Sequence, residues 1–224
     1  MPYVNAGPSR KNRSWVVYIA DDGSKTIRSG GSRSWRNNNP GNLRYTRFAR
    51  NHSAIGTAGG FAVFPDYPTG RAELSALLHS TSYFNLSIYS AIARYASPQD
   101  DDAENYRRLL ARLTGLDIQR KLNDLTDNEF TKVVDAIQEI EGYVVGGEKP
   151  VRRIIGAILE DKRLMAFLIE GSDSYVSKAA AVQMAEHEDI DAVVARSAHG
   201  DFYLRAPPDS ASGNNFLALA RNGT

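Results

Sequence analysis

The chain has 224 residues, 42% of them hydrophobic, which predicts one globular domain of ordinary size plus a small one. Its formal net charge of +1 at pH 7 gives no basis for binding nucleic acid or a membrane surface. The chain contains no cysteine, which excludes disulfides, a cysteine nucleophile and thiolate metal sites.

The N-terminal part is predicted to be a short tail followed by a β-hairpin. Residues 1–13 are polar and basic, which indicates a loosely ordered tail. Residues 15–20 are strongly β-prone, Asp22-Gly23 is a turn signal, and residues 25–28 can return as a second strand. The Ser-Gly-Gly-Ser run at residues 29–32 is then expected to act as a flexible joint.

Residues 36–44 read Arg-Asn-Asn-Asn-Pro-Gly-Asn-Leu-Arg and form the most unusual stretch of the chain. Asparagine and glycine accept left-handed backbone angles and proline fixes its own φ, so a tightly turned, non-helical segment is predicted. An asparagine side chain carries both a donor and an acceptor. The loop can therefore brace neighbouring backbone or hydrogen-bond a polar ligand such as a sugar, and the pattern alone leaves both alternatives open.

The middle of the chain is expected to be helical after a loop at residues 51–60 and a short extended run at residues 61–64. Apolar residues then recur at helical spacing in five stretches. Ser97-Pro98 should end the second helix, the acidic run at residues 100–102 should cap the third, and Thr126 to Glu129 is a capping box that opens the fourth. The five predicted helices span residues 70–79, 87–95, 103–114, 126–140 and 151–169, with a short helical turn at 118–122.

A different succession of elements is predicted after Gly171. We expect a helix over residues 179–187, then a strand over 191–196 that turns at Gly200 and pairs with a second strand over 202–205. This end resembles a small bacterial domain of unknown function, which implies an appended module for docking or stability.

Several segments together resemble a family of bacterial and phage cell-wall-associated proteins. Its members carry an NNPGN-L/I-R motif, a G-F-A-V-F segment, a Y-A-P-P-x-E-N-x-T-x-x-Y segment and a later E-G. Here these correspond to residues 36–44, the Gly-Phe-Ala-Val-Phe run at 60–64, the stretch from Tyr95 to Tyr106, and Glu141-Gly142. Members are described as phage structural or virion lytic proteins, or as peptidoglycan hydrolases delivered into rival bacteria. The similarity covers residues 34–147, and it departs from the family at Asp101, where asparagine is usual, and at Ala103, where threonine is usual.

The resemblance implies a mainly α (α+β) protein with a lysozyme-like helical domain, an N-terminal β-hairpin and a small C-terminal α/β module. The predicted boundaries are a tail and hairpin at residues 1–33, a catalytic domain at 34–170 and a C-terminal module at 171–224. The implied activity is cleavage of the glycan strands of peptidoglycan, by a muramidase or a lytic transglycosylase. A non-catalytic wall-binding or virion structural protein is the alternative, and a peptidoglycan amidase is a weaker one, because wall amidases often use cysteine and histidine.

Glu141 is the leading candidate for the catalytic acid. A carboxyl group at the C-terminal end of a helix meets the negative end of the helix dipole, and partial burial adds to this effect. Both raise the pKa, as a general acid requires, and the family's E-G motif points to the same residue. A glycoside hydrolase needs a second carboxylate, and the candidates are Asp66, residues 100–102, Glu139 and Glu148. A lytic transglycosylase needs only one acid/base, which Glu141 alone can supply.

The expected substrate-binding residues come from the same motifs and from aromatic side chains that can stack on sugars. They are Asn38, Asn39, Asn42, Arg44, Phe64, Asp66, Tyr106 and Tyr143. The four histidines are scattered without zinc-ligand spacing, so neither a metal nor a cofactor is expected.

The expected site of action is the periplasm or cell wall, and the target is peptidoglycan. No run approaches about 18 apolar residues, so no transmembrane helix is predicted. The first five residues lack the apolar core of a secretory signal, so a phage particle or secretion machine would have to carry the protein from the cytoplasm to a target cell. An immunity or inhibitor protein is a further possible partner.

Overall fold

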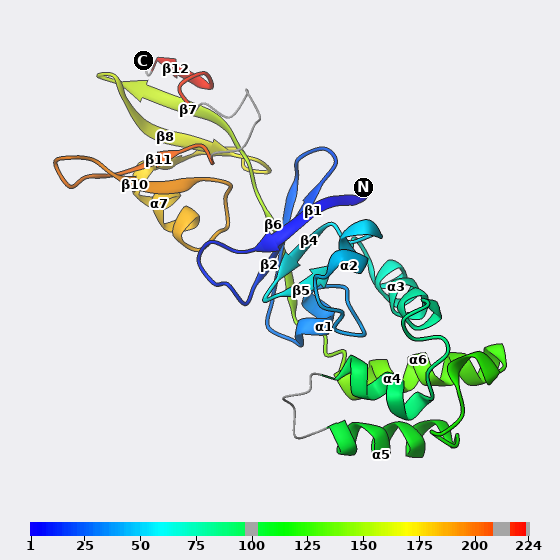
Figure 1. The fold of residues 1–224 in the computed structure, drawn as a ribbon. Helices are drawn as coiled ribbons and strands as arrows, with labels where there is room; N and C mark the ends of the chain where they lie inside the picture. Colours follow the sequence, from blue (N-terminus) through cyan, green and yellow to red (C-terminus); the bar gives the residue numbers. More distant parts are fainter. Residues whose placement is uncertain (97–102, 208–215, 223–224) are drawn as a thin grey trace. The chain divides into compact units, whose positions relative to one another are not determined.

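The computed structural model describes residues 1–96, 103–207 and 216–222 (Figure 1). It is 33% helix and 29% strand, and its strands form sheets of six, four and two strands. The prediction of a mainly helical, lysozyme-like protein is therefore wrong, because the chain is an α+β protein with substantial sheet. The chain divides into two compact units, one of Pro2–Tyr18 and Arg28–Gly147, and one of Met1, Ile19–Ile27 and Glu148–Thr224.

The predicted N-terminal tail is a strand. β1 (Tyr3–Pro8) pairs in parallel with β4 (Gly56–Ala58), which pairs antiparallel with β5 (Phe61–Val63). Local sequence could not show this, because β1 is held by a small core drawn from distant segments and by the ring of Tyr3, which lies 4.7 Å from that of Tyr18. The buried residues of this core are Ala6, Val16, Tyr18, Ala58 and Val63.

The predicted hairpin is confirmed as β2 (Val16–Ala20) and β3 (Lys25–Ser29). Its turn is closed by the Gly23 amide, which donates to the Ala20 carbonyl at 3.0 Å. Gly23 has a φ of 81°, a conformation that glycine adopts without strain.

The helices of the larger unit begin where side-chain caps satisfy their first amides. Asp66 caps α3 (Tyr67–His79), Ser87 caps α4 (Ile88–Tyr95), and Thr126 with Glu129 forms the predicted capping box of α6 (Asp127–Glu141). The predicted helices at residues 70–79, 87–95, 103–114 and 126–140 are thus confirmed, whereas the acidic run at 100–102 lies outside the described residues. The remaining helices are α1 (Arg33–Arg36), α2 (Arg47–Asn51), α5 (Ala103–Thr114) and the 3-10 turn η1 (Leu122–Asp124).

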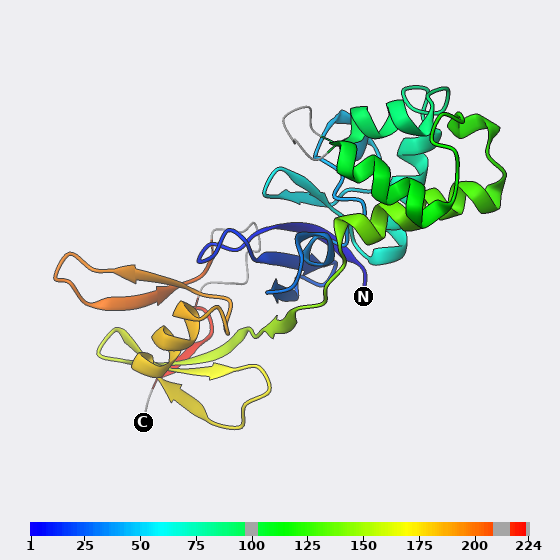
Figure 2. The same ribbon diagram turned by 90° about the horizontal axis from the view of Figure 1, so that it is seen from below.

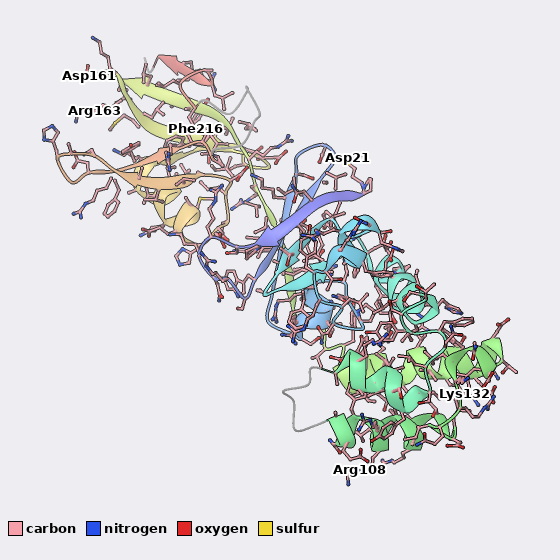
Figure 3. The ribbon with its side chains drawn as sticks, in the orientation of Figure 1. Asp21, Arg108, Lys132, Asp161, Arg163 and Phe216 are labelled. Carbon is pink, nitrogen blue, oxygen red and sulfur yellow. The ribbon has the colours of Figure 1, made fainter. Side chains whose placement is uncertain are left out.

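Helices α3 to α6 pack around one apolar core in the larger unit (Figures 1 and 2). Arg108 on α5 and Lys132 on α6 extend outward from this group of helices (Figure 3). The core brings α6 against both α3 and α5. Its largest fully buried side chains are Phe64, Leu74, Leu78, Ile88, Ile92, Leu110, Leu122 and Ile137.

The predicted helix over residues 151–169 is wrong, because this stretch is the hairpin of β7 (Ile154–Glu160) and β8 (Arg163–Ile169). Asp161 and Lys162 form its turn with φ of 46° and 60°, and Figure 3 shows Asp161 at the far end of the hairpin. A short apolar run reads equally well as helix or strand, and neither turn residue is the glycine or asparagine that usually marks such a turn.

The four-stranded sheet of the smaller unit has the order β12-β7-β8-β9, with β9 at Tyr175–Ser177 and β12 at Ala220–Asn222. The predicted boundary at residue 170 falls between β8 and β9, which pair with each other. The predicted helix and second hairpin are confirmed as α7 (Lys178–Glu186), β10 (Val193–Arg196) and β11 (Phe202–Arg205). Phe167 and Phe216 meet in the core of this unit, with ring centroids 6.0 Å apart. The one strand not yet given, β6 (Gly147–Val151), was not predicted.

Candidate functional site

Three of the four asparagines in the loop are buried and bind backbone. Asn39 is fully buried, and its amide donates to the Leu43 and Ala62 carbonyls at 2.9 Å while accepting from the Leu43 amide at 2.8 Å. Asn37 donates to the Ala58 and Ala62 carbonyls. A buried amide with all its partners in the backbone fixes the loop conformation. Of the two alternatives left open by the sequence, bracing applies to Asn37 and Asn39.

Asn38 has the same bracing role and is reached by an arginine. Its φ is 50°, and its amide donates to the Phe64 and Pro65 carbonyls at 3.2 and 3.0 Å. The Arg28 guanidinium donates to its side-chain oxygen and also to the Trp35 carbonyl. Asn38 and Asn39 were both expected to bind substrate, but their side chains are buried and hydrogen-bond the protein itself.

Asn42 is the exception, because its side chain leaves the loop and meets Glu141. Its backbone is left-handed with a φ of 48°, and its Nδ2 donates to Glu141 Oε2 at 2.8 Å. Arg33 Nε donates to Asn42 Oδ1 at 3.3 Å. Since an arginine nitrogen only donates, this bond turns the amide so that its own donor faces the carboxylate.

The second oxygen of Glu141 meets a tyrosine from α5. The Tyr106 hydroxyl donates to Glu141 Oε1 at 3.3 Å. Burial raises the pKa of Tyr106, and the charge of Glu141 raises it further, so this hydroxyl stays protonated and able to donate. The candidate site therefore consists of Arg33, Asn42, Tyr106 and Glu141, of which the sequence predicted all but Arg33.

Tyr95 closes the site from α4. Its ring centroid lies 6.4 Å from that of Tyr106, and its hydroxyl donates to the Gly41 carbonyl. Burial is the main cause of its strongly raised pKa. A Cβ atom on Gly41 would lie 2.6 Å from the Tyr95 hydroxyl, so only glycine fits beside the ring at this point of the loop. This contact fixes the position of the neighbouring Asn42.

The segment after Glu141 is clamped to the start of α1. The Ser32 amide donates to the Val144 carbonyl at 2.8 Å, the Val144 amide donates back to Ser32 Oγ at 3.0 Å, and Ser34 donates to the Gly142 carbonyl. A Cβ atom on Gly31 would lie 2.5 Å from the Val144 oxygen. The predicted flexible joint at residues 29–32 is thus a close packing contact that holds α6 against the loop.

The other predicted site residues are placed elsewhere. Phe64 is fully buried, so its ring cannot stack on a sugar, which corrects that expectation. Asp66 is the N-cap of α3 and accepts from the Thr69 amide at 2.7 Å. Tyr143 packs edge-on against Tyr67, with ring centroids 5.0 Å apart. Arg44 is exposed, and its guanidinium lies over the same Phe61 ring as that of Arg33.

A pocket of about 420 Å³ lies between α3 and α6, away from these contacts. It is linked to the site through Gln138, one turn before Glu141, which accepts from the Tyr67 hydroxyl and from Arg71. Glu141 itself does not line this pocket. Its lining residues are Tyr67, Pro68, Arg71, Ala72, Ser75, Phe130, Thr131 and Val134.

The candidate second carboxylates lie in different parts of the chain. Glu139 is exposed and Asp66 is engaged as a cap, while residues 100–102 lie outside the described part of the chain. Glu148 begins the other compact unit. Across residues 1–96, 103–207 and 216–222, no three acidic or histidine side chains gather as metal ligands, and no helix is long and apolar enough to cross a membrane.

No family model, no curated protein and no solved structure matches this chain.

Proposed function

We propose that the protein cleaves the glycan strands of peptidoglycan, as a muramidase or a lytic transglycosylase, with Glu141 as the general acid/base. The observation that carries this proposal is the contact between Asn42 of the asparagine-rich loop and Glu141 at the end of α6. Two separate motifs of the wall-associated family thus meet at one carboxyl group. Such an enzyme would meet its substrate in the periplasm or the cell wall.

The hydrogen bonds around Glu141 support a directed proton transfer. Oε2 accepts from an amide that can only donate at that position, so this oxygen stays an acceptor. A transferable proton would therefore be carried on Oε1, whose neighbour is the Tyr106 hydroxyl. That hydroxyl can donate to the ionised acid and can accept from the protonated one. Glu141 would protonate the glycosidic oxygen from Oε1 as the bond between that oxygen and C1 breaks. It would recover a proton from the water that bonds to C1 in a muramidase, or from the sugar's own C6 hydroxyl that bonds to C1 in a lytic transglycosylase.

The position of Glu141 on its helix also favours the acid role. It is the last residue of α6, where the negative end of the helix dipole opposes ionisation. Asn42, Tyr106 and the charge of Arg33 act in the opposite direction, since they stabilise the carboxylate. A group balanced between these effects can both release and recover a proton, as either glycan-cleaving reaction requires.

The decisive test compares Glu141→Gln with Glu139→Gln on purified cell walls. Glu139 is exposed and lies two positions earlier on the same helix, so it controls for the loss of one charge at the helix end. We expect Glu141→Gln to lower wall clearance and the release of soluble muropeptides, with either reducing or anhydro-sugar ends, by at least about a hundredfold, and Glu139→Gln to leave both nearly unchanged. Circular dichroism and Tm establish that both variants are folded.

Three outcomes would contradict the proposal. Clearance by Glu141→Gln at the wild-type rate would exclude the acid role. Binding to walls without any released fragments would indicate a wall-binding protein. Release of free amino groups without reducing ends would indicate an amidase. If cleavage occurs, mass spectrometry separates hydrolysis from transglycosylation, because the anhydro-sugar product lacks one molecule of water.

A further inference from the structure

Two arginines on either side of the asparagine-rich loop share one aromatic ring beside the candidate site. Arg44 forms an isolated antiparallel β-bridge with Phe61 of β5, flanked by hydrogen bonds from Ala62 to Leu43 and from Tyr45 to Gly60. The Arg44 guanidinium carbon lies 5.1 Å from the centre of the Phe61 ring, and that of Arg33 lies 3.6 Å from it. A guanidinium within about 6 Å of a ring is attracted to its face. Phe61 therefore holds both cations on the same patch of surface.

This pair lacks the close ion pairs that other arginines of the protein form, although the charge of Glu141 acts on Arg33. Arg71, Arg120 and Arg153 each form an ion pair with a carboxylate at 2.6 Å. Neither Arg33 nor Arg44 forms an ion pair within the described residues, and both are exposed. Two like charges placed together repel each other, which costs stability unless an anion lies between them. The arrangement is therefore typical of a site that receives a negatively charged ligand.

The site is joined to the proposed catalytic acid by two hydrogen bonds. Arg33 Nε donates to Asn42 Oδ1 at 3.3 Å, and Asn42 Nδ2 donates to Glu141 Oε2 at 2.8 Å. Burial lowers the pKa of Arg33, the charge of Glu141 raises it, and Arg44 and Arg36 lower it again. Both Glu141 and Arg44 therefore interact electrostatically with the Arg33 guanidinium. An anion bound here would be fixed one amide away from Glu141.

We propose that Arg33, Phe61 and Arg44 form a subsite for a carboxylate group carried by the glycan strand next to the bond that is cleaved. This inference rests on the proposed function. Peptidoglycan offers this chemistry from two sources, the stem peptides and the free lactyl group of a muramic acid without its stem. The fork of guanidinium donors matches a carboxylate in two parallel hydrogen bonds, and Phe61 orients the forks. The subsite would favour muramic-acid glycans over neutral chitin.

Binding is measured by calorimetry in a Glu141→Gln background, so that no ligand is consumed. Three ligands of equal glycan length are compared: a muro-oligosaccharide with stem peptides, the same oligosaccharide stripped to its lactyl carboxylates, and a neutral chito-oligosaccharide. Arg44→Gln should weaken binding of a carboxylate-bearing ligand about tenfold and leave the chito-oligosaccharide unchanged. Arg44→Lys should restore part of the loss, because it keeps the charge but not the paired donors.

Arg47→Gln is the matched control, since Arg47 is an exposed arginine of α2 with no aromatic contact among the described residues. It should bind all three ligands as the parent does, and added salt should weaken the parent more than Arg44→Gln. If Arg44→Gln weakens binding of the peptide-bearing ligand only, the subsite binds the carboxylates of the stem peptides. If it also weakens binding of the stripped ligand, the subsite binds the lactyl carboxylate.

Equal weakening of the neutral ligand, unchanged binding of both charged ligands, or no measurable binding of either would overturn the subsite. Because the measurement needs no cleavage, it is independent of the proposed activity. If walls stay intact with the wild type while Arg44→Gln still weakens the charged ligands, glycan cleavage fails and the subsite stands.

Discussion

The Nδ2 atom of Asn42 lies 2.8 Å from Oε2 of Glu141, although 99 positions separate the two residues in the sequence. The contact joins the asparagine-rich loop to the end of α6. The loop is rigid because its other asparagines are buried and hydrogen-bonded to backbone. The helix end is rigid because the residues that follow it are hydrogen-bonded to the start of α1. Neither partner can move independently of the other. The carboxyl group is therefore preorganised before any ligand binds.

Replacing Asn42 by glycine removes the amide and keeps the backbone. Glycine accepts the φ of 48° without strain, so the Tm should fall only by what the lost hydrogen bond to Glu141 contributes. A hydrogen bond to a charged group contributes about 1.5–3 kcal/mol, and loss of this amount from the transition state corresponds to about a ten- to hundredfold fall in the rate of the proposed wall cleavage. Loss of a donor that favours the ionised acid should also move the alkaline limb of the pH–rate profile to higher pH. A variant with the wild-type rate and profile would contradict the role of Asn42.

Gly31 and Gly30 form a matched pair that tests the clamp behind Glu141. Both have positive φ, 56° and 63°, so alanine costs about 1 kcal/mol of backbone strain at either position. Only at Gly31 does the new Cβ meet the Val144 oxygen, at 2.5 Å, whereas at Gly30 its nearest neighbour is at 4.0 Å. Gly31→Ala should therefore unfold at lower denaturant concentration than Gly30→Ala, and its activity should fall because Glu141 is displaced. Equal stability of the two variants would show that the contact between residue 31 and the Val144 carbonyl can relax without cost.

Local chemistry made much of the larger unit predictable from sequence. Thr126 was readable as a cap because it and its target amide, that of Glu129, lie within three residues of each other. Glu141 and Asn42 could be proposed from the sequence because each lies in a short motif, and the structure places them in contact. The sequence could not show that Asn39 turns inward while Asn42 turns outward, because that choice depends on the carbonyls of a distant strand.

The misread elements depend on partners far along the chain. β1 is a strand because β4 pairs with it about fifty residues later, and nothing within residues 1–13 indicates this. Arg33 was not predicted as a site residue because its two contacts, Asn42 and Phe61, come together only when the loop and β5 are paired. Phe64 was misassigned for the same reason, since burial of one aromatic in a motif is decided by helices that the motif does not contain.

The capping box of α6 predicts a loss of stability in acid. Two hydrogen bonds from Arg120, at 2.6 and 3.0 Å, are the main cause that lowers the pKa of Glu129 from 4.5 to about 2, and the Thr126 amide adds to it. Because the folded pKa is the lower one, this stabilisation is complete above about pH 4.5 and is lost as the pH falls from there towards 2. The Tm of Glu129→Gln should therefore lie below that of the wild type at pH 7 and approach it at pH 2. A Tm difference that is constant across this range would contradict the linkage.

The turn of the β7–β8 hairpin should be improvable by a single substitution. Lys162 has a φ of 60° in a two-residue turn, a conformation that costs an ordinary side chain about 1 kcal/mol and glycine almost nothing. Lys162→Gly should therefore raise the stability of the smaller unit by a few tenths of a kcal/mol to about 1 kcal/mol, despite the greater chain entropy of glycine when unfolded. Gly171 also has a positive φ, 78°, so Gly171→Ala is the reverse control and should destabilise the same unit. Hydrogen exchange of the β7 and β8 amides reports both changes directly. If Lys162→Gly slowed none of these amides, the turn would not limit the opening of this hairpin.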